Sequence, residues 1–525
     1  DGSGEPCGSG PGASGTIVPV RNNRIVPRPS LGDVIAGVSV GLVLIPQSMA
    51  YAELAGMPAY VGLFAGALPP LLAAPFASSP YLQTGPVALT SLLTFGALEG
   101  RAELASVDYV ALAALLALIV GLVRLALGLA RLGVVAYLMS EPVLMGFTSG
   151  AAILIMASQI PTVFDVDPTT EGVLERAWWT FVHPDQWQSG ALLFAGLTLV
   201  LMLGGRRLHR LFPGVLVAVI VATIASSALD YSGSTLGDLP GEFIHLDFDM
   251  PWGSFGQLLV PGIVIALVGY AEPASISRTF ATADRQRWDS SRELVGQGVA
   301  NVAAGLSGAF PVGGSFSRSS LNRFAGATSQ WSGAITGALV LAFLPFSETL
   351  ESLPRAVLGA IVLGAVFKLF EPIPIARLWP VSPMQGFVAT ATFVLTLVSA
   401  PRVDRGVIAG VALSFVVHVV RQLRVEAEHE LVDDVLTIRP RGVIWFGSAP
   451  RMEDVIVDAL AGHPEVKTVC LDLAAAGRVD YTAAGVLHRF VDDCAASGIE
   501  VRIVHLDPRS NTVARRLQRD VDPDS

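Results

Sequence analysis

Long apolar blocks separated by short polar stretches fill most of the chain between residues 31 and 421, whereas both ends are polar. Several blocks reach the roughly 20 residues that an α-helix needs to cross a bilayer. Clear examples are residues 31–56, 110–130 and 212–229. Hydropathy predicts about fourteen crossings, some of them broken. The pattern therefore predicts an α-helical polytopic membrane protein.

The positions of Lys and Arg predict how the crossings are oriented. The crossings are expected near 32–54, 59–76, 84–99, 108–129, 136–160, 188–204, 212–229, 258–280, 292–308, 314–326, 330–346, 352–370, 383–399 and 404–421. Arginines gather before the first crossing and after the sixth, the eighth and the last, whereas the loops at 163–187 and 230–249 are acidic. Loops rich in Lys and Arg stay in the cytoplasm. Both termini are therefore expected there, which requires an even number of crossings.

The two ends of the chain differ in character from the apolar region. Residues 430 to 520 show short apolar strands alternating with amphipathic helices, with strands expected at 442–447, 466–473 and 500–506 and helices at 451–463 and 483–498. This alternation predicts a small cytoplasmic α/β domain. Residues 1–30 begin with a Gly/Ser-rich stretch and are expected to form a flexible N-terminal segment.

Composition narrows the classes of function. Only 15% of the residues are charged, against about a quarter in soluble domains. The net charge of −10 comes from acidic soluble regions and gives no reason to expect nucleic-acid binding. Cys7, Cys470 and Cys494 form no metal or disulfide framework. Without a nucleophile–base arrangement or a phosphate loop, we expect no enzyme, no cofactor and no metal site.

Two short segments interrupted by Gly and Pro occupy matching positions in the two halves of the predicted crossings. They are residues 81–93, in the third crossing of the first seven, and residues 310–321, in the third crossing of the second seven. Transporters built from inverted repeats place their substrate site at such segments. Because the repeats would have opposite topology, the two half-helices are expected to enter from opposite sides. Their N-termini would then meet near the middle of the membrane.

The residues at these two segments suit an anion. A helix N-terminus offers free backbone N–H groups and about half a positive charge, and two of them aimed at one place make an anion site. Gly85 and Gly313–Gly314 allow close backbone approach. Ser315 and Ser317 add hydroxyl donors, and Arg318 adds a full charge that is costly at membrane depth without a function. One such segment alone is explained by tight helix packing; two in matching positions favour an anion site.

Several long stretches of the chain resemble the SulP family, the sulfate-permease-like anion transporters. "GLVLIPQSMAYAELAGMPAYVGLFAG" at 41–66 is similar to the first two crossings of that family, and "SSPYLQTGPVALTSL" at 78–92 to its third. "GYAEPASISRTFA" at 269–281 and "FPVGGSFSRSSLNRFAGATS" at 310–329 are similar to its eighth and tenth crossings. The tail resembles the STAS domain that most members contain. The resemblance covers nearly the whole chain beyond its first thirty residues.

The resemblance implies a fold, a site and an assembly. It implies a seven-plus-seven inverted repeat, here about 31–229 and 258–421, in which a core domain moves against a gate domain within a 31–421 transport domain, and usually a homodimer. It places the substrate between crossings one, three, eight and ten. Carried over to this sequence, the substrate-binding residues are Gln47, Tyr51, Gly85, Pro86, Val87, Ala88, Ser315, Phe316, Ser317 and Arg318.

Glu272 raises the question of how transport is driven. It lies inside a predicted crossing and is followed by Pro273. Burial disfavours the ionised form of a carboxylate, so Glu272 can exchange a proton during transport. The alternative is a structural ion pair, for example with Arg318. The resemblance favours a proton, because Glu at this position of the family tends to accompany protons and Asp sodium.

Two other charged residues have ordinary explanations. Arg124 is expected near the cytoplasmic end of a crossing, where its side chain would extend to the aqueous interface. Glu53 is expected at the solvated outer end of the first crossing, although it could also line an access path.

Together these features predict a secondary active transporter of the inner membrane that imports a small anion, such as sulfate, bicarbonate or a C4-dicarboxylate, with a proton by alternating access. The alternatives are an anion exchanger or channel, and a sodium-coupled bicarbonate symporter. A nucleobase permease of the same fold is disfavoured by the charge of Arg318, and a membrane-anchored regulator by the intact broken segments. The expected partners are the anion, a proton or sodium ion, membrane lipid, a second subunit and a cytoplasmic regulator acting through the STAS domain.

Overall fold

The computed structural model describes residues 28–505 apart from 102–105, 138, 209–211, 240, 242, 245, 247–248, 371 and 424–425. Most of the expected N-terminal segment, and the tail after residue 505, lie outside the described residues. The chain divides into two compact units. The first comprises Asp1–Ala136, Ser158–Thr170 and Arg176–Ala365, and the second comprises Tyr137–Ala157, Glu171–Glu175 and Val366–Ser525.

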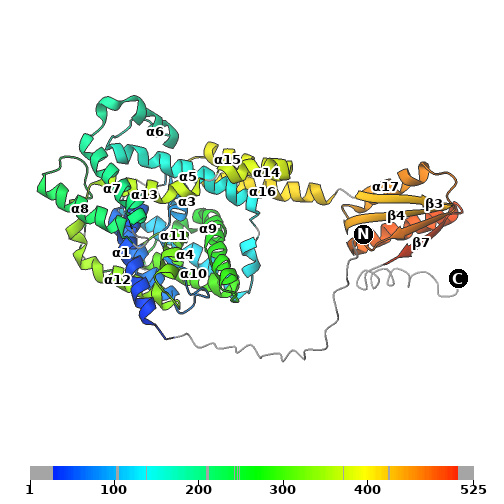
Figure 1. Ribbon diagram of the computed structural model, residues 1–525, viewed down its shortest axis with the longest axis horizontal. Helices are drawn as coiled ribbons and strands as arrows, with labels where there is room; N and C mark the ends of the chain where they lie inside the picture. The colour runs from blue at the N-terminus through cyan, green and yellow to red at the C-terminus, as the bar shows by residue number, and fades with distance from the viewer. Residues whose placement is uncertain are drawn as a thin grey trace, which may run out of the picture. The chain divides into compact units, whose positions relative to one another are not determined.

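The apolar region is helical (Figure 1). Along the chain, its two halves repeat the same order of elements. The first half contains α1 (Leu31–Leu54), α2 (Ala59–Ala73), β1 (Thr84–Gly85), α3 (Ala88–Leu98), α4 (Val107–Leu129), α5 (Glu141–Phe164), α7 (Ser189–Leu208) and α8 (Gly214–Ala228). The second contains α9 (Phe255–Ala283), α10 (Ser290–Leu306), β2 (Gly313–Gly314), α11 (Phe316–Phe324), α12 (Trp331–Phe343), α13 (Arg355–Val366), α15 (Pro383–Val398) and α16 (Val403–Gln422). Every predicted crossing coincides with one of these helices or strand–helix pairs.

Two shorter helices, α6 (Val173–Val182) and α14 (Pro372–Val381), lie between the predicted crossings. Among the described residues, six helices are long and apolar enough to cross a membrane by length and composition, and further apolar helices are shorter. One boundary differs clearly from its prediction, since α5 begins at Glu141 rather than 136 and follows a 3₁₀ turn at Gly133–Tyr137. Pro142 explains this start, because proline favours the first turn of a helix and has no N–H to bond further back.

Glycines allow α4 and α10 to pack with their backbones almost in contact. A Cβ atom added to Gly121 on α4 would lie 2.5 Å from the backbone nitrogen of Val302, and one added to Gly298 on α10 would lie 2.7 Å from that of Leu125. Helices within membranes associate closely through such small residues. Helix α10 also packs along α2, and α9 packs along α4. These contacts fix α10 and α9 around the two short strands.

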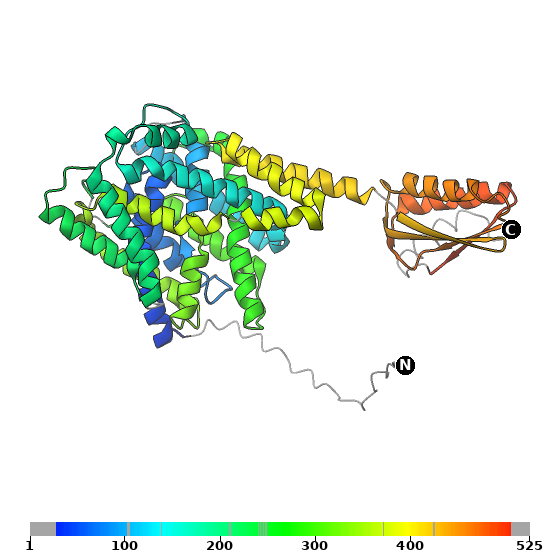
Figure 2. The ribbon, with the colours of Figure 1, turned by 45° about the horizontal axis from the view of Figure 1, so that its top comes forward.

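The C-terminal domain is a five-stranded sheet with two helices. Its elements are β3 (Glu426–Val432), β4 (Val435–Ile444), α17 (Ala449–Ala461), β5 (Thr468–Asp472), β6 (Ala476–Val479), α18 (Tyr481–Ala496) and β7 (Glu500–Val504). The strand order is β3-β4-β5-β7, with β6 also paired to β4, and only the β3–β4 pair is antiparallel. Both helices lie on the same side of the sheet (Figure 2). The predicted α/β domain is therefore present.

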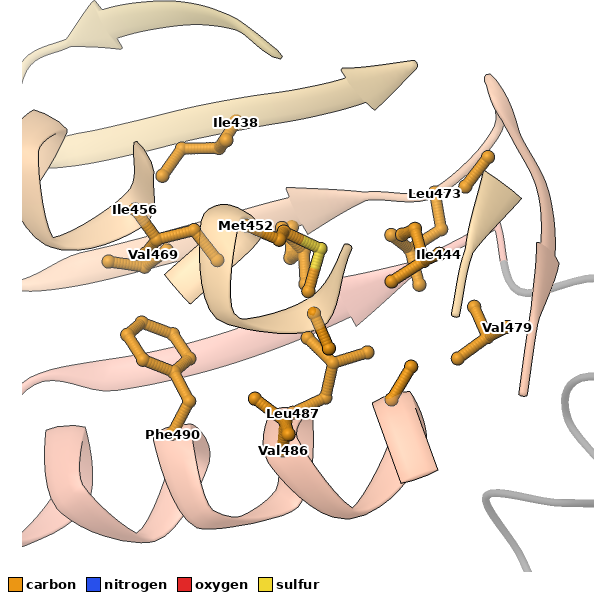
Figure 3. Packing of buried hydrophobic residues seen from close by; sticks show 14 of the residues in the cluster. Ile438, Ile444, Met452, Ile456, Val469, Leu473, Val479, Val486, Leu487 and Phe490 are labelled. Carbon is orange, nitrogen blue, oxygen red and sulfur yellow. The ribbon is translucent and has the colours of Figure 1, made fainter. Parts of the chain in front are cut away.

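The core of this domain lies between the helices and the sheet. Figure 3 shows the side chains that fill it, which include Met452 and Ile456 from α17, Leu487 and Phe490 from α18, and Ile438 and Val469 from the strands. These residues are almost completely buried. Their burial follows the apolar faces that the sequence places at helical spacing on α17 and α18.

The first hairpin of the domain corrects the prediction made from the sequence. The strand expected at 442–447 begins earlier, at Val435, and ends at Ile444, and the neighbouring strand β3 was not predicted. A tight turn with Asp433 at φ 56° joins the two strands. Arg439 pairs with Glu430 at 3.1 Å and Arg441 with Glu428 at 2.7 Å. These cross-strand ion pairs place charged residues in both strands of the hairpin. The sequence therefore shows no clear run of apolar residues from which β3 could be predicted.

Candidate functional site

The two broken segments meet through their short strands. Strand β1 pairs with β2 in antiparallel fashion, with Thr84 opposite Gly314 and Gly85 opposite Gly313. The pairing continues beyond the strands, because the backbone N–H of Ser315 donates to the carbonyl of Gln83 at 3.1 Å. Helix α3 starts three residues after Gly85 and helix α11 two residues after Gly314. The sequence prediction that the two half-helices begin beside each other is thus matched by the backbone.

Side chains cap the starts of the two half-helices weakly or not at all. No side chain caps α3, whose N-cap residue is Val87. The hydroxyl of Ser315 caps α11 with a long contact of 3.5 Å to the backbone nitrogen of Arg318. Gly85 has φ +153°, a conformation that favours glycine. The positive ends of two helix dipoles therefore converge on this place.

Arg318 is buried here without a partner. Arg318 is 1% exposed, and among the described residues its Nε, Nη1 and Nη2 atoms have no hydrogen-bond partner. A Cβ atom added to Gly85 would lie 3.5 Å from Nη2, so the guanidinium reaches the strand that precedes α3. A buried guanidinium normally forms several hydrogen bonds, because leaving it unpaired costs much free energy. Arg318 is thus a buried cation whose hydrogen-bonding capacity is unused in this structure.

The structural ion pair considered for Glu272 and Arg318 does not form. The guanidinium nitrogens have no hydrogen-bond partner, so the carboxylate makes no direct contact with them. Glu272 on α9 lies instead next to the backbone N–H of Phe316, the first residue of α11, and within electrostatic reach of Arg318. The carboxylate therefore faces the same helix N-terminus at which the anion is expected.

The residues from the first crossing face the same region. The hydroxyl of Tyr51 lies within electrostatic reach of both Arg318 and Glu272. Leu44 lies on the same helix α1, about two turns before Tyr51, and beside Gly85. Gln47 falls on that face between Leu44 and Tyr51, is 5% exposed, and its Oε1 atom has no hydrogen-bond partner. A second buried polar group without a partner thus lies on the α1 side of the site.

The remaining predicted residues line the two helix starts. Pro86, Val87 and Ala88 are buried. Because their side chains are apolar, they can offer only backbone groups. Ser317 and Phe316 are exposed, and Phe316 has 54% of its surface accessible. The first turn of α11 therefore faces open space on one side.

Three aromatic side chains, those of Tyr81, Phe280 and Phe316, pack together beside the exposed first turn of α11. The ring of Phe316 stacks on Phe280, with centroids 6.1 Å apart, and Phe280 packs edge-on against Tyr81. The guanidinium of Arg323 covers Tyr81 and Phe280 and forms an ion pair with Asp284. These contacts tie the end of α11 to the end of α9.

Arg124 corrects a prediction from the sequence. It does not extend to the interface but is fully buried. Its Nε, Nη1 and Nη2 atoms donate to the carbonyls of Ala266, Val312 and Ile265 at 3.0, 3.0 and 3.2 Å. Glu53 is likewise no solvated helix end, since its carboxylate accepts from Arg355 Nε at 2.8 Å and only 14% of its side chain is exposed.

Helix α10 contains three buried polar residues that the sequence analysis missed. Glu293 accepts from the backbone N–H groups of Ser78 and Ser79 at 3.1 and 2.7 Å. Gln297 donates to the Thr84 hydroxyl at 2.7 Å, and Asn301 bonds both backbone groups of Val312. The signal was their spacing, because polar residues at every fourth position of an apolar helix share one face. They hold the two broken segments in place.

Comparisons with known proteins identify the relatives of this fold. The model of the sulfate permease family matches residues 31–392, and that of the STAS domain matches residues 426–520. "Sulfate transporter 4.1, chloroplastic" of Arabidopsis thaliana is 30% identical over 90% of this chain and 74% of its own length. A probable sulfate transporter of Mycobacterium tuberculosis is 34% identical over 73% of this chain and 69% of its own.

A solved structure shares the fold. The murine Solute Carrier 26 family member A9 anion transporter, in its inward-facing state, superposes with a TM-score of 0.85 and covers 94% of this chain and 88% of its own at 19% identity. The predicted architecture, a helical inverted-repeat transporter fold followed by a STAS domain, is thereby confirmed. The chain therefore belongs to the sulfate permease family, and it is a membrane-spanning transporter rather than an enzyme.

Proposed function

We propose that this protein is a secondary active transporter that imports a small anion together with a proton. The anion is held between the N-termini of α3 and α11 by backbone N–H groups, by the hydroxyls of Ser315 and Ser317, and by Arg318. One observation supports this most strongly: the Arg318 guanidinium is buried and has three nitrogens without partners. An oxyanion with two oxygens facing the guanidinium satisfies such donors in bidentate fashion.

Glu272 is the proposed proton-coupling residue. Its carboxylate lies beside the Phe316 N–H and near Arg318, so in its charged form it competes with the anion for one positive region. Anion binding therefore favours protonation of Glu272, and by linkage protonation tightens anion binding. Gln47 and Tyr51 complete the site from α1. The carboxylate supports proton-driven transport over an anion exchanger or channel.

The wider setting of the proposal follows the family. The transport domain spans residues 31–421 with repeats at about 31–229 and 258–421, works by alternating access in an elevator-like manner, and forms a homodimer in the inner membrane. Both termini lie in the cytoplasm, where the STAS domain at residues 430–520 binds a regulator. Sulfate is the first substrate to test, because the relatives quoted above are named as sulfate transporters. Bicarbonate and C4-dicarboxylates follow.

Uptake of labelled anions into proteoliposomes tests the proposed function. Purified protein is reconstituted and offered sulfate, bicarbonate, succinate and uracil, each with an inward proton gradient, an inward sodium gradient or none. We expect accumulation of one of the anions above its equilibrium level only with the proton gradient, and no uptake of uracil. Sodium-driven accumulation of bicarbonate would replace the proton by sodium. Uptake that only equilibrates the anion under every gradient would establish an exchanger or channel instead.

A further inference from the structure

Arg124 is a second buried arginine in the first compact unit, and its surroundings differ from those of Arg318. It lies on α4, and the three nitrogens of its guanidinium donate to backbone carbonyls only. Two of these carbonyls, Ile265 and Ala266, belong to α9 between Pro261 and Pro273. The third, Val312, belongs to the segment that leads into β2. One side chain thus joins the helix of Glu272 to the backbone that leads into α11.

Asn301 on α10 also holds Val312. Its Oδ1 atom accepts from the Val312 N–H at 2.9 Å, and its Nδ2 atom donates to the Val312 carbonyl at 3.1 Å. One turn earlier on α10, Gln297 holds Thr84 of β1. Every backbone hydrogen-bonding group of Val312 is therefore fixed by a buried side chain. Val312 precedes Ser315, the N-cap of α11, by three residues.

Gly269 leaves the space that Arg124 needs. A Cβ atom added to Gly269 would lie 2.7 Å from Nη2 of Arg124, closer than real contacts allow. The residue lies on α9, three positions before Glu272. An alanine at this position would push the guanidinium away from the carbonyls without removing it.

We propose that Arg124, with Asn301, is a positioning residue for the transport site. By fixing Val312 against α9, the two side chains set how far the N-terminus of α11 lies from the Glu272 carboxylate. That distance determines how strongly the bound anion and the carboxylate affect each other, because their interaction falls with separation. Arg124 thereby couples anion binding to protonation without contacting either ligand. This inference rests on the proposed function.

The test compares Arg124→Met with wild type and with Arg101→Met, in full-length protein reconstituted into liposomes. Arg101 is a matched control, because it also donates to a backbone carbonyl, that of Ala97, and to Gln257 on α9. Uptake of [35S]sulfate is measured as KM and maximal rate over a series of external pH values. We expect Arg124→Met to raise KM at least about tenfold and to flatten the pH dependence, Arg124→Lys to fall between, and Arg101→Met to change neither.

Gly269→Ala keeps the test decisive if Arg124→Met does not fold. We expect it to raise KM and flatten the pH profile in the same direction. A folded Arg124→Met or Gly269→Ala protein with the wild-type KM and pH profile would overturn the inference, as would a loss confined to melting temperature and maximal rate. If wild type takes up none of sulfate, bicarbonate and succinate, the proposed function fails; if it takes up one of the other two, that anion replaces sulfate in these measurements. Amide hydrogen exchange at residues 312–318 then tests the positioning role by itself. A positioning role predicts faster exchange there in Arg124→Met than in Arg101→Met, and equal exchange in the two variants would overturn it.

Discussion

Arg318→Ala is expected to abolish anion uptake while the protein inserts and purifies normally. A charge-assisted hydrogen bond contributes about 1.5–3 kcal/mol, and an arginine that binds an oxyanion in bidentate fashion makes a pair of them. Their loss weakens anion binding on the order of 10²–10⁴-fold. Uptake of labelled anion into proteoliposomes measures the loss. Wild-type kinetics in this variant would refute the site assignment.

The stability of the same variant separates a functional role from a structural one. The Arg318 side chain has no hydrogen-bond partner among the described residues, so its removal eliminates a desolvated charge without breaking a hydrogen bond. The melting temperature of Arg318→Ala is therefore expected to equal or exceed that of wild type. Arg287→Ala, at an exposed position, serves as the control and should keep both uptake and stability. A lowered melting temperature in Arg318→Ala would assign the arginine to the packing of the protein.

Glu272→Gln is expected to bind and carry the anion but to lose the response to protons. Glutamine resembles the protonated acid in shape and charge, and so leaves the positive region around Phe316 and Arg318 free for the anion. In wild type, uptake should rise as external pH falls, because the protonated carboxyl no longer competes with the anion. In the variant, uptake should not depend on pH, and a proton gradient should not drive accumulation. Uptake rates at several external pH values measure the difference.

Glu293→Gln provides a matched control for this experiment. Glu293 is also a buried carboxylate in the same unit, yet it holds the backbone of Ser78 and Ser79 rather than facing α11. Its substitution is expected to lower the melting temperature, since glutamine replaces one of the two side-chain oxygens by an NH2 group that cannot accept from these N–H groups, and to leave the pH dependence of uptake intact. If Glu272→Gln keeps full proton-driven accumulation, Glu272 is structural and the coupling group lies elsewhere.

Much of the fold followed from the sequence because the bilayer restricts what an apolar chain can form. The crossings were set by hydropathy, and their bounds agree with the helices to within a few residues at most positions. The pairing of the two half-helices followed from Gly and Pro at matching positions of the two halves. Arg318 was identifiable as a charge placed beside those glycines.

What the sequence did not predict depends on contacts between distant segments. Arg124 was expected at the aqueous interface because the sequence of one helix does not show which hydrogen-bond acceptors surround it. Its acceptors are backbone carbonyls more than 140 positions later in the chain. Glu53 was expected in solvent for the same reason, although Arg355 meets it. In the C-terminal domain, β3 was missed because charged residues interrupt its apolar pattern, and two of them, Glu428 and Glu430, pair with Arg441 and Arg439 on β4.

The position of a bound anion shows directly whether transport uses the site between α3 and α11. Selenate resembles sulfate and scatters X-rays anomalously, so an anomalous difference map from crystals of the protein grown with selenate locates it. We expect a selenium peak between the starts of α3 and α11, in direct reach of the Arg318 guanidinium and of the backbone N–H groups of Phe316 and Ser317. An ordered selenate elsewhere in the transport domain, with this place empty at a saturating concentration, would contradict the account.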